Sequence, residues 1–302
     1  MRALVTGAYL RRVAVLAALV LPFVSACGDP PTAGLHLAAN QNFSPGGDFL
    51  PGELGFTMAD VTGPSDLVHL PDGVRALVWV GRCDGVTPGF TDAVQPYLDS
   101  SKVFGYYLID EPDPTGRWRP LCSPAKLAAE SDYLHQHSVG RKTFMIMMNL
   151  GSPTSPTYTD RGASYTPANT HVDLVGLDPY PCRSELNGCD YAGIGRYLRA
   201  AEAGGWGVAS IVPVFQAFGG GNWVDAGGGR WQLPTAGQAA TILSTWNRLV
   251  PNPVFDYAYS WGSQMNDTAL SAAPASLRQV FAEHNRQRTG RQTGAAASPS
   301  AH

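Results

Sequence analysis

The stretch VFGYYLIDEP, residues 103–112, decides the fold class. Residues 103–109 are apolar and rich in aromatic and β-branched side chains, which predicts a short buried β-strand. Proline cannot donate to a sheet ladder, so the strand ends before Pro112 and Glu111 lies in a loop or cleft. Carboxylates at the carboxyl end of a strand are where α/β barrels carry their chemistry. The alternative interpretation makes Asp110, Glu111 and Asp113 a solvated loop with helix-capping duties.

Strand-like and helix-like segments alternate along the chain. Eight segments are predicted as strands, at residues 35–39, 55–59, 74–80, 103–109, 143–148, 172–177, 208–215 and 255–260. Helices are predicted at residues 90–100, 123–137, 190–203, 235–249 and 273–286. This pattern favours an α/β fold of the (β/α)8 TIM-barrel type. No GxGxxG motif follows the first strand, which argues against a dinucleotide-binding fold. The first strand is weakly patterned, and an imperfect barrel with seven clear strands is the alternative.

The amino terminus has the plan of an export signal. Arg2, Arg11 and Arg12 precede an apolar stretch, residues 13–24, that is short for a membrane span. The following VSAC, residues 24–27, resembles the lipobox of bacterial lipoproteins, in which the cysteine becomes a lipidated amino terminus. An ordinary secretory signal with a chance cysteine is the alternative.

The lipobox resemblance sets the predicted organisation. Residues 1–26 are a signal peptide, 27–33 a tether, 34–288 a single barrel domain and 289–302 a disordered tail rich in glycine, alanine and serine. Lipid on Cys27 would hold the protein on the outer face of the bacterial cytoplasmic membrane.

The cysteines agree with export. Setting Cys27 aside leaves Cys83, Cys122, Cys182 and Cys189, an even number that suggests disulfides in an exported chain. Three pairings are possible. The short loop between Cys182 and Cys189 favours that pair, and Cys83 would then pair with Cys122. A four-cysteine zinc site is the alternative, but no CxxC spacing supports it. We therefore expect no metal and no cofactor.

Charge limits the class of partner. The formal net charge is −3, and loss of the three signal arginines makes the mature chain more acidic still. Lysine occurs only at positions 102, 126 and 142, and no basic stripe is present. Nucleic acid is therefore not an expected partner. We expect a monomer.

Polar and aromatic residues recur at the ends of the predicted strands. They are Asp60, Asp110, Glu111, Asn149, Asp178, Tyr180, Gln216 and Trp261. A barrel gathers these ends onto one face. Rings such as Trp79, Trp231 and Tyr259 can stack on the apolar faces of sugars, although core packing is the simpler explanation for any single ring. The group predicts a carbohydrate site, with Asp60, Asn149, Tyr180, Gln216 and Trp261 binding substrate.

With these residues in place, the chain resembles the large clan of barrel glycoside hydrolases. In that clan the acid/base glutamate follows the fourth strand in an Asn-Glu-Pro context, a second glutamate after the seventh strand is the nucleophile, and a tryptophan often follows the eighth. Glu111, in an Asp-Glu-Pro version of the motif, matches the acid/base. Trp261 matches the tryptophan. Gln216 occupies the nucleophile position, and an amide cannot form a glycosyl ester as a carboxylate does.

A second carboxylate is available at Asp178, in the extended segment LDPYP, residues 177–181. Glycoside hydrolysis usually needs two carboxyl groups, about 5–5.5 Å apart for retention and about 6.5–9.5 Å for inversion. Strands four and six are not adjacent, which favours the longer separation. Asp110 could instead be the second acid, or could raise the pKa of Glu111 by repulsion. A loop-shaping role is the alternative for Asp178.

The leading functional hypothesis is a cell-surface glycoside hydrolase that cleaves O-glycosidic bonds of an oligo- or polysaccharide. Glu111 is its general acid, with Asp178 and Asp110 as further catalytic carboxylates. The second hypothesis is a non-catalytic carbohydrate-binding lipoprotein on a degenerate glycosidase barrel, which Gln216 favours. A structural module of the cell envelope is the third.

Overall fold

A computed structural model describes residues 34–116, 119–147, 165–186, 188–224 and 228–295. Eight parallel strands form a closed barrel in the order β1-β11-β9-β6-β5-β4-β3-β2. Their bounds are β1 Leu35–Ala38, β2 Met58–Val61, β3 Arg75–Trp79, β4 Val103–Asp110, β5 Lys142–Ile146, β6 Leu174–Leu177, β9 Ile211–Gln216 and β11 Phe255–Tyr259. The predicted (β/α)8 barrel is therefore confirmed.

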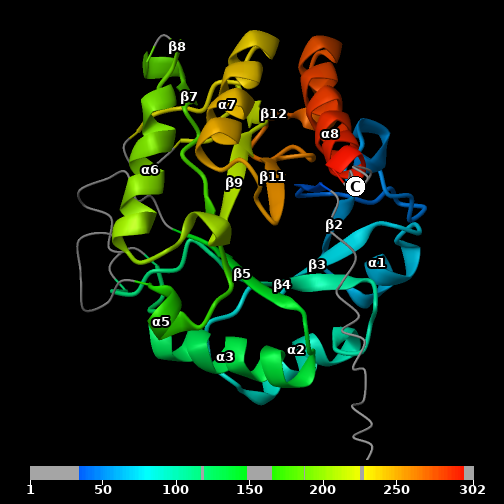
Figure 1. Ribbon diagram of the computed structural model, residues 1–302, viewed down its shortest axis with the longest axis vertical. Coiled ribbons are helices and arrows are strands. Elements are labelled where there is room, and N and C mark those ends of the chain that lie inside the picture. The colour runs from blue at the N-terminus through cyan, green and yellow to red at the C-terminus, as the bar shows by residue number, and fades with distance from the viewer. Residues whose placement is uncertain (1–33, 117–118, 148–164, 187, 225–227, 296–302) are drawn as a thin grey trace, which may run out of the picture. The chain divides into compact units, whose positions relative to one another are not determined.

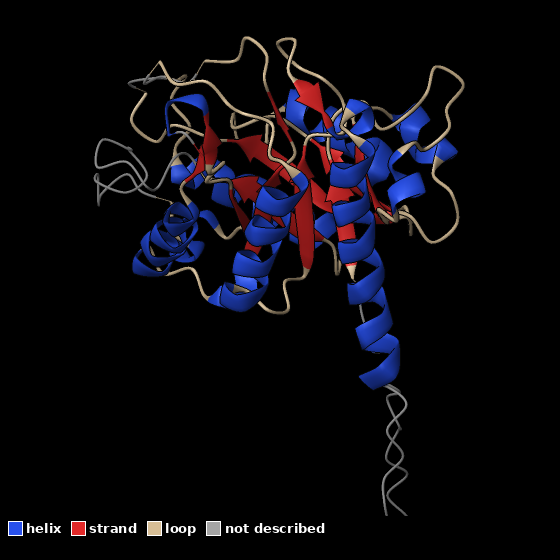
Figure 2. Cartoon of the chain, turned by 90° about the horizontal axis from the view of Figure 1, so that it is seen from above, coloured by secondary structure: helices blue, strands red, loops and turns tan. Residues whose placement is uncertain are grey.

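Helices surround the strands (Figure 2). They are α1 Pro64–His69, α2 Pro88–Val94, α3 Pro124–His137, α5 Pro167–Thr170, α6 Tyr191–Ala203, α7 Ala236–Leu249 and α8 Ala275–Ala295. Figure 1 shows α6, α7 and α8 on the side of β9 and β11, and α2 and α3 on the side of β4 and β5. Side chains cap the first turns of α3 and α7, because the Ser123 hydroxyl accepts from Lys126 N and the Thr235 hydroxyl accepts from Gln238 N.

Short elements complete the chain. Two small antiparallel pairs lie outside the barrel, β7 Cys182–Arg183 with β8 Gly188–Cys189, and β10 Phe218–Gly219 with β12 Thr268–Ala269. In the described residues the 3-10 turns are η1 Pro51–Leu54, η2 Gln95–Tyr97, η3 Ser184–Leu186, η4 Val208–Ser210 and η5 Leu270–Ala272.

The first strand is a full member of the barrel. β1 pairs with β11 over four residues and with β2 at Leu37, so the barrel closes. The second strand begins at Met58 instead of at the predicted residue 55. Gly55 has a φ of 79° and ends η1 in a left-handed conformation, which a strand cannot include.

The carboxyl terminus differs from the prediction. α8 continues to Ala295, so residues 289–295, expected in a disordered tail, are helical. A helix that has already formed adds one hydrogen bond per residue, and extension beyond a well-packed segment therefore needs no further nucleation.

Two apolar layers build the core. Alternate residues of each strand fill the barrel, among them Leu37, Phe144 and Val214, and the residues between them pack under the helices. Buried polar groups also lie in the outer layer, and the group around Asp256 connects two strands to a helix. Asp256 of β11 accepts from His36 Nδ1 of β1 at 2.7 Å and from His284 Nε2 of α8 at 2.9 Å, which ties the last helix to the barrel.

Both predicted disulfides are present. Cys83–Cys122 joins the loops that follow β3 and β4, with Cα atoms 5.5 Å apart, and Cys182–Cys189 closes the β7–β8 hairpin. Cys27 and the predicted signal peptide lie outside the described residues. None of the helices in the described part of the chain combines the length and apolar composition that a bilayer crossing requires.

Candidate active site at the mouth of the barrel

Strand alternation brings the predicted carboxylates to one end of the barrel. In β6, Leu174 points into the barrel, so Asp178 four residues later lies on the same side at the rim. In β2, Met58 and Asp60 share the inner side in the same way. Asp110 ends β4 and Glu111 follows it. The three strands therefore present Asp60, the Asp110–Glu111 pair and Asp178 to one mouth.

Irregular backbone geometry in β4 sets the direction of the carboxylates at its end. The β3–β4 and β4–β5 registers both shift along β4, and Phe104 and Tyr107, three residues apart, both face inward. Such bulges re-aim side chains next to active sites. Gly105 makes the close approach possible, because a Cβ there would lie 2.3 Å from the Lys142 carbonyl oxygen. Glu111 itself has a φ of 40°, and its N–H donates to the Ile146 carbonyl at 3.1 Å.

The carboxyl groups perturb one another. Burial, followed by the neighbouring Asp110 charge, raises the pKa of Glu111 to about 7. Burial, followed by the charges of Glu111 and Asp110, raises the pKa of Asp178 well above its usual range. Two carboxyl groups this closely coupled cannot both ionise easily, so the pair retains a proton near neutral pH.

Asp110 is the acid best suited to carry a charge. Its side chain is exposed, but the protein atoms around the carboxyl group displace water and raise the pKa of Asp110. The Tyr107 hydroxyl donates to Asp110 Oδ1 at 2.7 Å, and this bond together with the Arg119 cation opposes the rise. Asp110 thus has two neighbours that favour its charged form, the Tyr107 hydroxyl and the Arg119 cation.

Arg119 is a site residue that the sequence did not reveal. Its Nη2 lies 2.7 Å from Glu111 Oε2, with the Arg119 side chain 46 % exposed and that of Glu111 27 % exposed. Buried Asp113 shapes the loop that returns Arg119 to Glu111. Its carboxylate accepts from the Thr115 N–H and hydroxyl and from the Arg119 N–H. An arginine soon after the Asp-Glu-Pro motif was the only signal available in the sequence.

Asp60 forms the far side of the mouth. Burial raises its pKa to about 6, and the Asn40 N–H donates to its Oδ2 at 3.1 Å. The Asn40 amide also donates to the Tyr259 hydroxyl, which in turn donates to Gln264. Asp60 was predicted to bind substrate, and its side chain lies at the barrel mouth.

Aromatic rings surround Asp178. Tyr180, predicted to bind substrate, hydrogen-bonds to the Asp178 carboxyl group and has a φ of 28°. Its ring lies 5.5 Å from that of Trp231 and 5.9 Å from that of Tyr259, centre to centre. Tyr259 lies at the end of β11 and is partly exposed. These rings make a wall that suits the apolar face of a sugar.

Gln216 is not a substrate-facing residue, which corrects the prediction made from the sequence. Its side chain is fully buried. Its Oε1 accepts from Cys182 N at 2.8 Å, and its Nε2 donates to the carbonyls of Cys182 at 2.9 Å, Gln232 at 3.0 Å and Phe218 at 3.3 Å. The amide at the expected nucleophile position is a cross-link between two loops that cover the end of β9.

Trp261 also departs from the prediction. It is 2 % exposed and packs in the outer apolar layer, between the barrel and the helices. Tyr259 continues the inward series of Phe255 and Tyr257, whereas Trp261 lies beyond the end of β11, where the regular alternation of the strand no longer sets its direction. Asn149, also predicted to bind substrate, lies outside the described residues.

One group in the described residues has the composition of a metal site. His36, Asp256 and His284 offer ligand atoms within 4.8 Å of one another. Hydrogen bonds from the two imidazoles to the two Asp256 oxygens account for this geometry. The same bonds hold the pKa of Asp256 below its usual range despite burial. The group is a structural clamp in the outer layer, away from the inward-facing carboxylates.

Comparison with known proteins finds solved structures with a similar fold. No protein-family model matches the chain, and no curated protein matches its sequence. Among solved structures, catalytic domain 2 of a Group II chitinase from Ostrinia furnacalis has a TM-score of 0.54 at 11 % identity, covering 85 % of this chain and 97 % of that one. A chitinase from Bacteroides thetaiotaomicron has a TM-score of 0.53 at 10 % identity, covering 89 % and 99 %.

A third similar structure is a calcium-binding mutant of β-glucuronidase 2 from Bacteroides uniformis. It has a TM-score of 0.51 at 14 % identity, and the match covers 84 % of this chain and 34 % of that one. At these identities the likeness establishes a shared barrel. A shared fold does not determine the activity, which depends on the residues at the barrel mouth.

Proposed function

We propose that this protein is a glycoside hydrolase that cleaves an O-glycosidic bond at the barrel mouth, with Glu111 as general acid. The observation that carries the proposal is the setting of Glu111. It lies at the carboxyl end of a barrel strand, is partly open to solvent, and has a pKa raised to about 7. A general acid works best when its pKa is close to the working pH.

The chemical steps follow from this arrangement. Glu111 gives its proton to the glycosidic oxygen, the bond from the anomeric carbon to that oxygen breaks, and positive charge develops on the sugar ring. Asp110, held by Tyr107 and near Arg119, supplies negative charge near that cation. After departure of the leaving sugar, the Glu111 carboxylate takes a proton from the incoming water.

Asp178 is proposed to orient the attacking group. Gln216 cannot attack, since it is an amide buried in backbone hydrogen bonds. Attack then falls to water or, as in some glycosidases, to a group of the substrate itself. Asp178 is hydrogen-bonded to Tyr180 and electrostatically coupled to Glu111, and can hold either group by a hydrogen bond.

The proposed setting is the bacterial cell surface. The lipobox-like residues 24–27 support export and lipid attachment at Cys27. The chitinases among the structural neighbours make oligosaccharides of N-acetylglucosamine the first substrates to test.

The test compares Glu111→Gln with wild type on a panel of natural and aryl glycosides. We expect turnover to fall about 10²–10⁴-fold on substrates with poor leaving groups, and less on activated aryl glycosides, which need less protonation. Glu202→Gln, an exposed substitution on α6, is the control and should leave turnover unchanged. Full activity of Glu111→Gln would refute the proposal. Sugar binding by wild type without any hydrolysis would favour the alternative, a carbohydrate-binding lipoprotein.

A further inference from the structure

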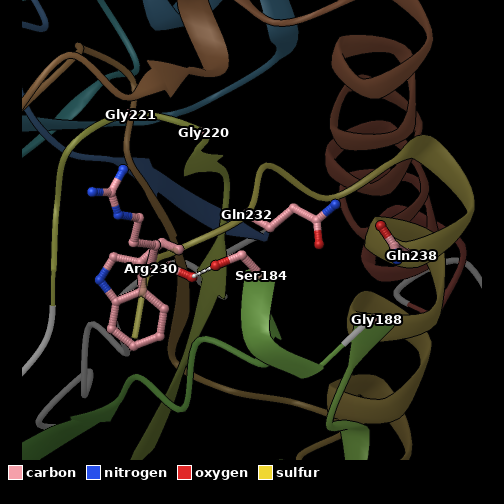
Figure 3. Close-up of a pocket in the computed structure, with 8 residues that line it drawn as sticks. Ser184, Gly188, Gly220, Gly221, Arg230, Gln232 and Gln238 are labelled. Atoms are coloured by element: carbon pink, nitrogen blue, oxygen red, sulfur yellow. Dashed lines mark hydrogen bonds between the residues drawn. The ribbon is translucent and has the colours of Figure 1, made fainter. Parts of the chain in front are cut away.

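A cavity opens beside the aromatic wall of the site. It has a volume of about 540 Å³, within the range of small-ligand sites. Its lining includes Ser184, Gly220, Arg230, Trp231, Gln232 and Gln238 (Figure 3). Hydroxyl, amide and guanidinium groups therefore dominate the walls, with one indole among them.

The walls are built rigidly. One is the β7–β8 hairpin, closed by the Cys182–Cys189 disulfide. The other is the segment 230–232, which pairs with the hairpin through Ser184 N to the Arg230 carbonyl at 3.0 Å and Gln232 N to the Cys182 carbonyl at 3.0 Å. Gln216 bonds to the backbone of both walls, at Cys182 and at Gln232. The buried amide is thus the positioning residue of this cavity.

Trp231 links the cavity to the carboxylates. It lines the cavity, and its ring contacts Tyr180, which is hydrogen-bonded to Asp178. A glycan bound across the mouth can therefore place a neighbouring sugar unit in the cavity without leaving the protein surface.

The charge of the cavity is opposite to that of the mouth. Arg230 is exposed, and no carboxylate of the described residues forms an ion pair with its guanidinium. Figure 3 shows its side chain extending away from Ser184, on the side of the Gly220–Gly221 turn. Among the other charged groups nearby, Glu185 pairs with Arg183 and accepts from the Arg230 backbone N–H at 3.3 Å, and the Arg183 guanidinium lies 4.7 Å from the centre of the Trp231 ring. Asp267 accepts from Gly221 N and is buried beneath the turn.

We propose that this cavity is a subsite for a sugar unit that carries a carboxylate, next to the unit whose bond is cleaved. Arg230 binds the carboxylate, because a guanidinium offers two parallel donors that match its two oxygens. The amides of Gln232 and Gln238 and the hydroxyl of Ser184 bind sugar hydroxyls. This inference rests on the proposed function for the cleavage itself, but binding in the cavity is measured separately from hydrolysis.

The test measures binding of two tetrasaccharides to the full chain carrying Glu111→Gln, so that no substrate is consumed. One probe alternates N-acetylglucosamine with glucuronic acid, and the other is chitotetraose, which is neutral. On adding Arg230→Gln, we expect the Kd of the acidic probe to rise about tenfold and that of the neutral probe to change less than twofold. Arg230→Lys should restore part of the affinity, and Arg248→Gln, an exposed substitution at the end of α7, should have no effect.

Equal weakening of both probes, no effect of Arg230→Gln, or no binding of the acidic probe would each overturn the subsite. Hydrolysis is scored independently with the wild-type chain. Arg230-dependent binding without cleavage would refute the proposed hydrolase and support the subsite. Cleavage of neutral glycans without Arg230-dependent binding would refute the subsite and support the hydrolase.

Discussion

The barrel mouth and the clamp under α8 both contain buried aspartate, and their pKa values move in opposite directions. At the mouth, burial and neighbouring carboxylates raise the pKa of Asp178. In the clamp, His36 and His284 bond to both oxygens of Asp256 and lower its pKa although it is just as buried. The partners, and not the depth, determine which form of the acid is favoured. The clamp is organised for stability, while the mouth keeps carboxyl groups together at the expense of stability.

A raised pKa alone does not mark a catalytic acid. Burial raises the pKa of Glu130 on α3 to about 8, yet its Oε1 accepts from the N–H groups of Asp84 and Gly85 and shapes a loop. Glu111 differs because other carboxyl groups, a cation and solvent all reach it. The cluster, rather than any single shift, distinguishes the site.

The largest expected effect separates the two aspartates by stability. Asp256→Asn should lower the free energy of unfolding by about 3–5 kcal/mol at pH 7, because two buried hydrogen bonds to a carboxylate, each worth about 1.5–3 kcal/mol, are lost or weakened. Asp178→Asn should cost little or even stabilise, since its raised pKa means that ionisation opposes folding as pH rises. Urea denaturation at pH 5 and pH 8 measures both. If Asp178→Asn also lowered the free energy of unfolding by several kcal/mol at pH 8, the two aspartates would not differ as expected.

The pH dependence should have opposite sign in the two regions. Asp256, with a lowered pKa, contributes stability above its unfolded value that is lost as the solution becomes more acidic. Asp178 and Glu111, with raised values, contribute stability at low pH that is lost as pH rises through their folded values.

A second prediction concerns the amide at the end of β9. Gln216→Glu should not create a nucleophile. It should lower the free energy of unfolding by about 3 kcal/mol, because the carbonyls of Cys182 and Gln232 lose their donor and face a carboxyl oxygen. Thermal unfolding measures the loss, and Gln136→Glu, an exposed substitution on α3, is the control. Unchanged stability together with faster turnover would show that the position is catalytic after all.

The smallest expected effect concerns Arg119, which is about half exposed and therefore screened by solvent. Arg119→Gln removes a cation that stabilises the Glu111 carboxylate, so the pKa of Glu111 should rise slightly. The alkaline limb of the pH–rate profile should move to higher pH, and Arg119→Lys should return it toward wild type. A shift to lower pH would mean that the ion pair does not act on the general acid.

Local sequence patterns were enough to predict the barrel and the Cys182–Cys189 disulfide, because strand composition and short cysteine spacing are local properties. The Cys83–Cys122 disulfide then followed as the remaining pair. They also indicated Glu111 and Asp178, which follow strands directly. Long-range folding determined the rest. Arg119 reaches Glu111 only through a loop organised by Asp113, and Gln216 is covered by segments that lie far from it in sequence. Trp261 was misplaced because a ring at a strand end can face either layer.

The most direct test of the account is the titration of the Glu111 carboxyl group itself, with no substrate present. Carbon-13 NMR of the glutamate carboxyls, with Glu111 assigned by its absence in Glu111→Gln, gives this pKa in the folded chain. We expect a midpoint of about 7, so that the acid is substantially protonated at neutral pH. A midpoint close to 4.5, the ordinary value for glutamate, would contradict the assignment of Glu111 as a general acid.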